Sequence, residues 1–384
     1  MTTIAGRRFD TGESVRVSVE RGVITAIEPQ ADATDWLGPG LVDLQINGYG
    51  GQEFNDLALT PEQVASVSTA MDRDGLTAYL PTATTHSFEM LRHTMSVLAE
   101  ARRTIPEVAA RAPGFHLEGP YLSPQDGPRG AHPLEHIRPP DWDEFQRLQE
   151  AAEGGIRILT VSPEYDNAPE FIRRVVDSGV VVSIGHTAAT GEQIQAAADS
   201  GATSSTHLGN GAHGMLRRHP NYLWDQLADD RLVANLIADG HHLPDAVLKT
   251  FVRAKSPARC VLVSDITGLG GMPPGRYEST SIGDVEVLED GRLVVAGQRQ
   301  FLAGAALPLR RGVPQLMRAA GLSLAEALPL ATTQPARLAS LPAGDLRIGA
   351  RADLITFRLP ADDDNAPMLE ITSTMLAGNL VYTA

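Results

Sequence analysis

The sequence predicts an α/β fold: a (β/α)8 TIM-like barrel with a small β-sandwich domain built from the N- and C-terminal segments. Two observations carry this prediction. Eight apolar runs, separated by helix-like segments, recur through the middle of the chain, whereas the two terminal segments alternate apolar and polar residues. Strands that alternate with helices are typical of a parallel sheet, and alternation with a period of two is typical of strands with one solvated face.

The two ends of the chain are expected to form the small domain together. Residues 13–29 read ESVRVSVERGVITAIEP, which predicts a hairpin that turns at Arg21-Gly22. Residues 352–360 and 369–384 alternate in the same way, so we expect them to pair with the N-terminal strands. The predicted domains are residues 1–38 with 344–384 for the small domain, and 39–343 for the barrel.

The barrel strands are expected at runs that are apolar on both faces, as parallel strands covered by helices must be. Several of the segments between them read as helices that end in glycine, the usual residue after a helix C-terminus. An open doubly wound sheet would look similar, but no GxGxxG motif follows the first run. A hairpin is expected late in the barrel, at 285–297. The eight runs are 40–46, 77–83, 113–119, 156–164, 180–186, 203–209, 232–240 and 260–266.

Charge and cysteine content narrow the class of protein. The net charge is -15, which argues against nucleic acid or an anionic membrane as partner, because both need a broad positive face. Cys260 is the single cysteine, so the chain forms no internal disulfide. No stretch approaches the ~20 apolar residues that cross a bilayer, and the N-terminus lacks the apolar core of a signal peptide. We therefore expect a cytoplasmic protein.

Polar side chains end several of the apolar runs. Glu118 ends the third run, His186 the fifth, His207 the sixth and Asp265 the eighth, while the seventh ends in Asp-Gly-His-His at 239–242. In a (β/α)8 barrel the carboxyl ends of the strands meet on one face and carry the chemistry. These side chains are therefore expected to converge, although each alone could be a surface charge or a core histidine.

Glu118, His186 and His207 together match a known metal-binding pattern. Two histidines and one glutamate form a catalytic zinc shell, with a fourth position open for water. Gly119-Pro120 would turn the chain after Glu118 and aim its carboxylate into the barrel mouth. Asp265 is then the expected general base and acid, since a carboxylate beside a metal can take a proton from water and deliver it to a leaving group. The alternative is that Asp265 is a further ligand or a turn cap.

With these residues the chain resembles the N-acetylglucosamine-6-phosphate deacetylase family of the amidohydrolase superfamily. The resemblance runs from GPGLVDLQINGYGG to RIGARADLITF, and its most specific parts are HLEGPYLS, SIGHTAAT, THLGNG, IADGHHLP and VSDITG. It implies hydrolysis of an N-acetyl amide on an amino sugar phosphate, giving glucosamine 6-phosphate and acetate from N-acetyl-D-glucosamine 6-phosphate. It also implies Asp265 as the acid/base, and substrate contacts from His132, Asn210, Gly211 and His242.

The resemblance implies one divalent metal ion per subunit, with zinc expected and Fe2+, Mn2+ or Co2+ as alternatives. Two-metal members carry His-x-His at the end of the first strand, where this chain has Gln45-Ile46-Asn47, and amides are poor ligands for a transition metal. Many also bridge their ions with a lysine on the fourth strand. The two lysines here, Lys249 and Lys255, lie after the seventh run instead.

The loop after His207 departs from the family pattern and leaves the substrate open. Arg218 stands where the family has a phosphate-binding arginine that reaches into the neighbouring subunit, which implies a homodimer. Its neighbours differ, and FLAGAALPL at 301–309 has alanines where serines are usual. The alternative is an amidohydrolase that deacylates N-acetylgalactosamine 6-phosphate or an unphosphorylated N-acyl compound. A catalytically inactive relative used for binding would be expected to have lost ligands, and this chain keeps them.

Overall fold

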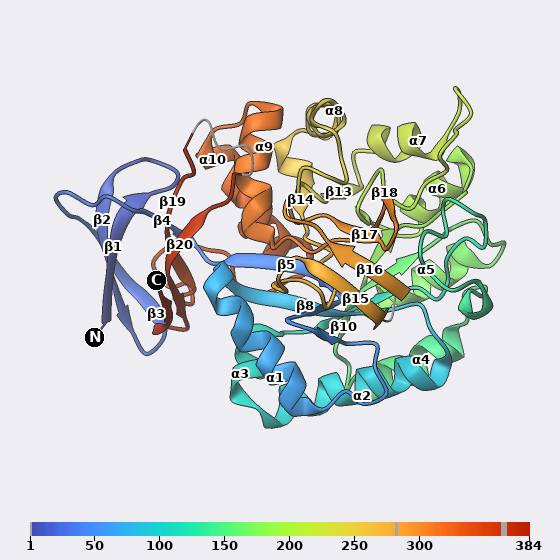
Figure 1. Cartoon of the computed structure of the whole chain (residues 1–384), viewed down its shortest axis with the longest axis horizontal. Helices are drawn as coiled ribbons and strands as arrows, with labels where there is room; N and C mark the ends of the chain where they lie inside the picture. The colour runs from blue at the N-terminus through green and yellow to red at the C-terminus, as the bar shows by residue number, and fades with distance from the viewer. Residues whose placement is uncertain (1, 281–282, 362–366) are drawn as a thin grey trace.

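The computed structural model describes residues 2–280, 283–361 and 367–384, and its centre is a barrel of eight parallel strands (Figure 1). Adjacent strands pair in chain order. The chain after the last strand returns to the first, because Asn47 N–H donates to Ile266 O at 2.8 Å and Asp265 N–H to Gln45 O at 3.0 Å. The predicted barrel is confirmed. Its strands are β5 (Leu41–Ile46), β8 (Leu76–Thr84), β9 (Phe115–Glu118), β10 (Ile156–Val161), β11 (Val181–Ile184), β12 (Ser204–Ser205), β13 (Val233–Leu236) and β14 (Cys260–Leu262).

Helices surround the barrel, and local sequence explains where they begin and end. Thr60 and Gln63 exchange hydrogen bonds in a capping box before α1, and Thr190 and Gln193 do so before α6. A short 3-10 helix at Met71–Asp74 continues α1, and Gly75, with φ 77°, ends it. The helices are α1 (Pro61–Ala70), α2 (Phe88–Thr104), α3 (Pro106–Arg111), α4 (Trp142–Ala151), α5 (Ala168–Asp177), α6 (Gly191–Asp199), α7 (Tyr222–Ala228), α8 (Asp245–Lys255), α9 (Gly312–Ala320), α10 (Leu324–Ala327) and α11 (Thr333–Leu338).

Both ends of the chain lie in one seven-stranded sheet beside the barrel (Figure 1). The strand β4 joins the two halves, pairing in parallel with β1 and antiparallel with β19. A separate apolar cluster fills this part, with Val17 and Leu37 from one end of the chain and Leu354 and Met375 from the other. The sheet strands are β1 (Thr2–Arg8), β2 (Ser14–Glu20), β3 (Val23–Pro29), β4 (Trp36–Pro39), β19 (Leu354–Arg358), β20 (Glu370–Leu376) and β21 (Asn379–Thr383).

The hairpin expected at 285–297 is present as β16 (Gly283–Val287) and β17 (Leu293–Val295). It forms the middle of a four-stranded antiparallel sheet, whose outer strands are β15 (Gly275–Thr280) and β18 (Gln298–Gly304). A two-stranded ribbon of β6 (Gly48–Tyr49) and β7 (Gln52–Glu53) follows β5. Both additions stand at the end of the barrel where the strands finish.

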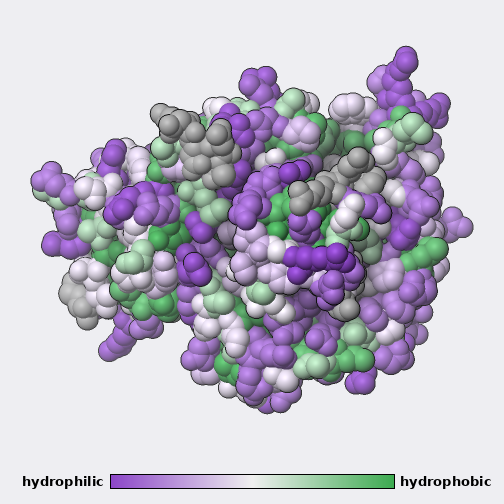
Figure 2. All heavy atoms as spheres, viewed as in Figure 1, coloured by the Kyte–Doolittle hydropathy of each residue, from purple (hydrophilic) through white to green (hydrophobic). Residues whose placement is uncertain are grey.

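The surface seen in Figure 2 is mainly hydrophilic. Hydrophilic residues cover most of the face seen in Figure 2, and hydrophobic residues are scattered among them. In the described part of the chain, no helix combines the length and apolar character needed to span a bilayer.

Candidate metal centre and active site

A cavity of about 700 Å³ opens at the carboxyl ends of the barrel strands. Eight of the nine predicted site residues line it, from five of the eight barrel strands and the loops that follow them. They are Glu118, His132, His186, His207, Asn210, Gly211, His242 and Asp265. The structure thus brings together side chains that lie up to 147 positions apart in the chain, because a parallel barrel gathers the ends of its strands.

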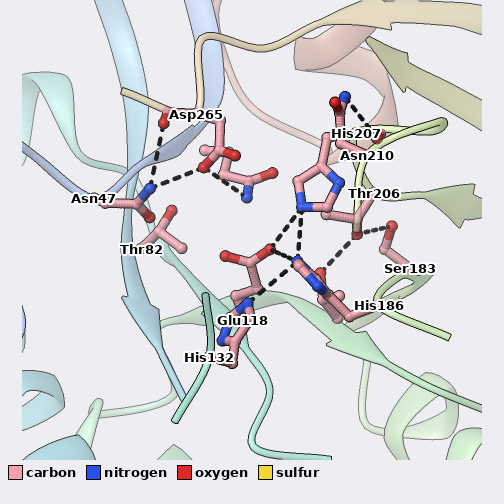
Figure 3. Close-up of polar contacts among 12 residues, drawn as sticks. Asn47, Thr82, Glu118, His132, Ser183, His186, Thr206, His207, Asn210 and Asp265 are labelled. Carbon is pink, nitrogen blue, oxygen red and sulfur yellow. Dashed lines mark hydrogen bonds and ion pairs between the residues drawn. The ribbon is translucent and has the colours of Figure 1, made fainter. Parts of the chain in front are cut away.

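Glu118, His186 and His207 meet at one point of the cavity wall (Figure 3). Nε2 of His207 lies 3.0 Å from Glu118 Oε1, Nε2 of His186 lies 3.3 Å from the same oxygen, and the two Nε2 atoms are 3.0 Å apart. All three side chains are buried, at 8% exposure or less. Three ligand atoms so close together leave a fourth side open to the cavity, as in a catalytic zinc site.

The chemistry of this donor set fits a divalent cation. Nδ1 of His186 donates to the carbonyl of Pro128 at 2.8 Å, which fixes the tautomer and leaves the lone pair of Nε2 facing Glu118 and His207. Two imidazole nitrogens and a carboxylate oxygen that face one another need a shared cation or proton between them. Imidazole with carboxylate is the ligand set that zinc and its neighbours prefer.

The backbone around these side chains is strained or crowded. His186, His207 and Asp265 have φ values of 47°, 28° and 52°, in the left-handed region that costs a non-glycine residue roughly 1–2 kcal/mol. Gly119, after Glu118, has φ 83°, and a Cβ there would stand 2.1 Å from Thr85 Oγ1. These turns redirect the chain where each strand ends, which points the functional side chains into the cavity. Strain of this kind concentrates at functional sites.

Burial and neighbouring groups determine which of the titratable side chains in the cavity are charged. Burial alone would raise the pKa of Glu118, but the contacts with His186 and His207 outweigh it and hold that pKa well below its usual range. Burial lowers the pKa of His132 to about 3, so this imidazole stays neutral. Burial, helped by the negative charge of Glu118, raises the pKa of Asp265 to about 6. The site therefore holds one firmly ionised carboxylate and one that can take up a proton near neutrality.

The predicted substrate contacts surround this centre. Nε2 of His132 lies 3.2 Å from Nε2 of His186. Gly211, with φ 55°, lies so close to His186 that a Cβ would stand 2.6 Å from its Nδ1, so the loop after His207 admits no side chain there. Asn210 N–H closes the turn by donating to His207 O at 3.0 Å.

Arg218 lies elsewhere. It is exposed on the loop before α7 and is absent from the described residues that line the cavity. Within one chain the structure therefore does not bring it to the site, and its contact with a neighbouring subunit's substrate stays a prediction.

Sequence reasoning missed part of the cavity wall. Asn55 donates to Thr84 O at 2.6 Å, and both residues line the cavity with Glu53 and His86. Thr84-Thr85-His86 directly follows the second apolar run at 77–83, so the strand-end pattern that found Glu118 and Asp265 would have found Thr84 and His86 too. Leu302, on β18, covers the cavity from the inserted sheet and carries no such signal.

The chain was compared with known protein families, curated proteins and solved structures. Residues 36–381 match the amidohydrolase family, and the chain belongs to that family.

Within it, the chain is similar to curated deacetylases of amino sugar phosphates. It is 32% identical over 349 residues to N-acetylgalactosamine-6-phosphate deacetylase of Escherichia coli O157:H7, covering 88% of this chain and 89% of that protein. It is 34% identical to N-acetylglucosamine-6-phosphate deacetylase of Bos taurus, covering 90% and 83%. A variant of the Mycobacterium smegmatis N-acetyl-D-glucosamine-6-phosphate deacetylase, solved with N-acetyl-D-glucosamine 6-phosphate, superposes with a TM-score of 0.87 at 30% identity, over 100% of this chain and 99% of that one.

Proposed function

We propose that this protein hydrolyses the N-acetyl amide of N-acetyl-D-glucosamine 6-phosphate, giving glucosamine 6-phosphate and acetate. The observation that carries the proposal is the convergence of Glu118, His186 and His207 on one point of a cavity that Asp265 also lines. Membership of the amidohydrolase family and similarity to curated deacetylases of this substrate support it.

Glu118, His186 and His207 would hold one divalent ion per subunit. Zinc is the expected ion, with Fe2+, Mn2+ or Co2+ as alternatives. When bound, such an ion supplies Lewis-acid polarisation of the acetyl carbonyl and lowers the pKa of a nearby water molecule.

Asp265 moves the protons in the proposed reaction. Its raised pKa suits a group that takes a proton from the attacking water and then delivers it to the amide nitrogen as the C–N bond breaks. Acetate and the free amine then leave. His132 is neutral and lies beside His186, so it can hydrogen-bond the acetyl oxygen and orient the amide.

Asn210, Gly211 and His242 would hold the sugar phosphate on the side of the cavity formed by the loops after β12 and β13. Arg218 would reach the phosphate from a partner subunit, which makes the protein a homodimer. Met215 on the same loop is 94% exposed and Trp224 on the following helix α7 is 50% exposed, and a partner could cover both apolar side chains. We place the protein in the cytoplasm as part of this proposal.

N-acetylgalactosamine 6-phosphate is the second candidate substrate, because curated deacetylases of that compound match this chain as well as the first group does. The cavity wall at Leu302 and Ala303 also offers no side-chain hydroxyl that could select one sugar hydroxyl. An unphosphorylated N-acyl compound is the third possibility that the assay must include.

The test is a substrate panel on enzyme reconstituted with Zn2+. Acetate release is measured with both 6-phosphates and with their unphosphorylated forms. The proposal expects the highest kcat/KM on N-acetylglucosamine 6-phosphate. A higher kcat/KM on the galactosamine compound would replace the substrate, and no acetate release from any of the four would overturn the function.

A further inference from the structure

Gln45 and Asn47 direct their amide groups at one oxygen of Asp265. Nε2 of Gln45 donates to Oδ1 of Asp265 at 3.0 Å, and Nδ2 of Asn47 donates to the same oxygen at 2.8 Å. Figure 3 shows Asn47 beside Asp265, across the cavity from Glu118. The backbone is tied as well, because Asp265 N–H donates to Gln45 O at 3.0 Å. The residues at the end of β5 thus fix both the backbone and the carboxylate of Asp265, where the last barrel strand meets the first.

The orientation of the two amides has a cost that ordinary packing does not explain. Oε1 of Gln45 and Oδ1 of Asn47 are buried and accept no hydrogen bond within the described part of the chain. A buried acceptor without a partner is destabilising, because it has given up its hydrogen bonds to water. Turning either amide over would set its oxygen against the carboxylate, so the N–H groups face Asp265 because a negative charge is there.

Two donors on one oxygen leave the two ends of the carboxylate unequal. A carboxylate oxygen has two lone pairs, and the two N–H groups occupy both on Oδ1. In the described part of the chain, no hydrogen bond ends on Oδ2. Oδ1 of Asp265 therefore has no lone pair left for a proton, whereas Oδ2 can accept one.

We propose that Gln45 and Asn47 are positioning residues that reserve Oδ2 of Asp265 for proton transfer. They fix the plane of the carboxylate and direct each proton, first from water and then to the amine, through one atom. The inference rests on the proposed function, since it takes Asp265 as the base. It gives the Gln-Ile-Asn sequence at the end of the first strand a role of its own, because here the amide N–H groups serve the catalytic acid.

The test compares variants that remove the amide group with variants that replace it by a carboxylate. Gln45→Met and Asn47→Ser remove one N–H donor each, and Gln45→Glu and Asn47→Asp set a second carboxylate against Asp265. Losing one hydrogen bond to a charged group should lower kcat about 10- to 100-fold, and the acidic variants should lower it further. KM should stay within about twofold, because the contact with substrate is unchanged. Metal content should stay at the wild-type value.

A double-mutant cycle separates positioning from a general structural role. In an Asp265→Asn background, Asn47→Ser should change the residual rate by less than about twofold. The amide of Asn47 acts on the Asp265 carboxylate, which this background lacks. A fall by the same factor in both backgrounds would overturn the inference, as would wild-type kcat in all four single variants. Asn167→Ala is the matched control, since that asparagine donates to Pro140 O at 2.7 Å, away from the cavity, and should leave kcat unchanged.

The outcomes also separate this inference from the proposed function. If Asp265→Asn is inactive while the Gln45 and Asn47 variants are normal, the function stands and the positioning role falls. If Asp265→Asn retains wild-type turnover, Asp265 is not the base, and both the mechanism and the inference fall. Thermal unfolding of each variant shows whether a lost rate reflects a lost fold, and the isosteric Asn47→Asp is the variant least able to disturb packing.

Discussion

Asp239 holds His242 by a hydrogen bond of 2.7 Å from Nδ1 to Oδ2. Its other oxygen accepts the backbone N–H groups of His241 and His242 at 2.8 and 2.9 Å. Burial alone would raise the pKa of Asp239, but the contact with His242 outweighs it and lowers the pKa to about 2. The pair fixes the proton of His242 on Nδ1 and leaves Nε2 as the nitrogen available to a ligand in the cavity.

Asp239→Asn should weaken substrate binding more than turnover. The amide of an asparagine cannot accept all three N–H groups that Asp239 accepts, so it holds His242 less firmly, and we expect KM to rise about 10-fold and kcat to change by less than about threefold. Steady-state kinetics measures both. His242→Ala should raise KM to a similar extent, and the double variant should add little, because the two residues act as one unit. An Asp239→Asn enzyme with wild-type KM would show that His242 needs no such support.

Removal of the metal should abolish activity and leave the fold in place. The ligands sit on barrel strands and their loops, which have their own apolar core. After dialysis against a chelator we expect acetate release to fall to background and to return with one equivalent of Zn2+. Metal analysis should give one ion per chain in the wild type and far less in His207→Ala. Full activity in chelated enzyme with no measurable metal would contradict the proposed site.

Arg218→Ala should raise KM for a phosphorylated substrate about 10- to 100-fold and leave the unphosphorylated analogue unaffected, because a charge-assisted hydrogen bond is lost. Arg217→Ala, at an exposed neighbour, is the matched control. Mixing Arg218→Ala chains with Asp265→Asn chains tests whether the arginine acts across the dimer. Mixed dimers would then contain one complete site and regain activity, whereas an arginine that serves its own chain would leave both sites broken.

The unfolding free energy should fall as the pH rises through neutrality because of Asp43. This buried carboxylate accepts the N–H of Gln45 at 3.1 Å and that of Ser264 at 3.2 Å, which ties β5 to the chain after β14. Burial raises the pKa of Asp43 from 3.8 to about 7, so the fold favours its protonated form. Its stabilising contribution is complete below pH ~4 and is lost as the pH rises through about 7, with a slope of at most ~1.4 kcal/mol per pH unit.

Asp43→Asn should remove that slope. Urea unfolding at pH 5, 6, 7 and 8 measures the free energy for both proteins. Relative to the variant, the wild type should lose most of this stability between pH 5 and 7 and level off towards pH 8. Parallel curves for the two proteins would mean that Asp43 keeps an ordinary pKa in the fold.

The sequence predicts the barrel and the strand-end residues because both follow from local patterns. Glu118, His186, His207 and Asp265 each end an apolar run, and the geometry of a parallel barrel then brings them to one mouth. The hydrogen bonds from Gln45 and Asn47 to Asp265 could not be predicted in this way. They join positions 220 and 218 residues apart, and their geometry depends on how the barrel closes.

The inserted sheet was only half predicted for a different reason. β16 and β17 pair in regular register, which produces the alternation that the sequence displays. The register of β15 shifts between Tyr277 and Thr280, and that of β18 shifts twice, so the alternation is broken in both outer strands. The domain boundaries at 38 and 344 stay a prediction.

The position of β4 between β1 and β19 affects how the small domain folds during synthesis on the ribosome. Ribosomes release β4 about 300 residues before β19 exists, which is roughly 15 to 60 seconds at 5–20 residues per second. Throughout that interval the edge of β4 that β19 later covers has no partner. Unpaired edges recruit other chains, so crowded polysomes and slow translation of the segment between β4 and β19 are the conditions under which the newborn protein is most exposed to misassembly.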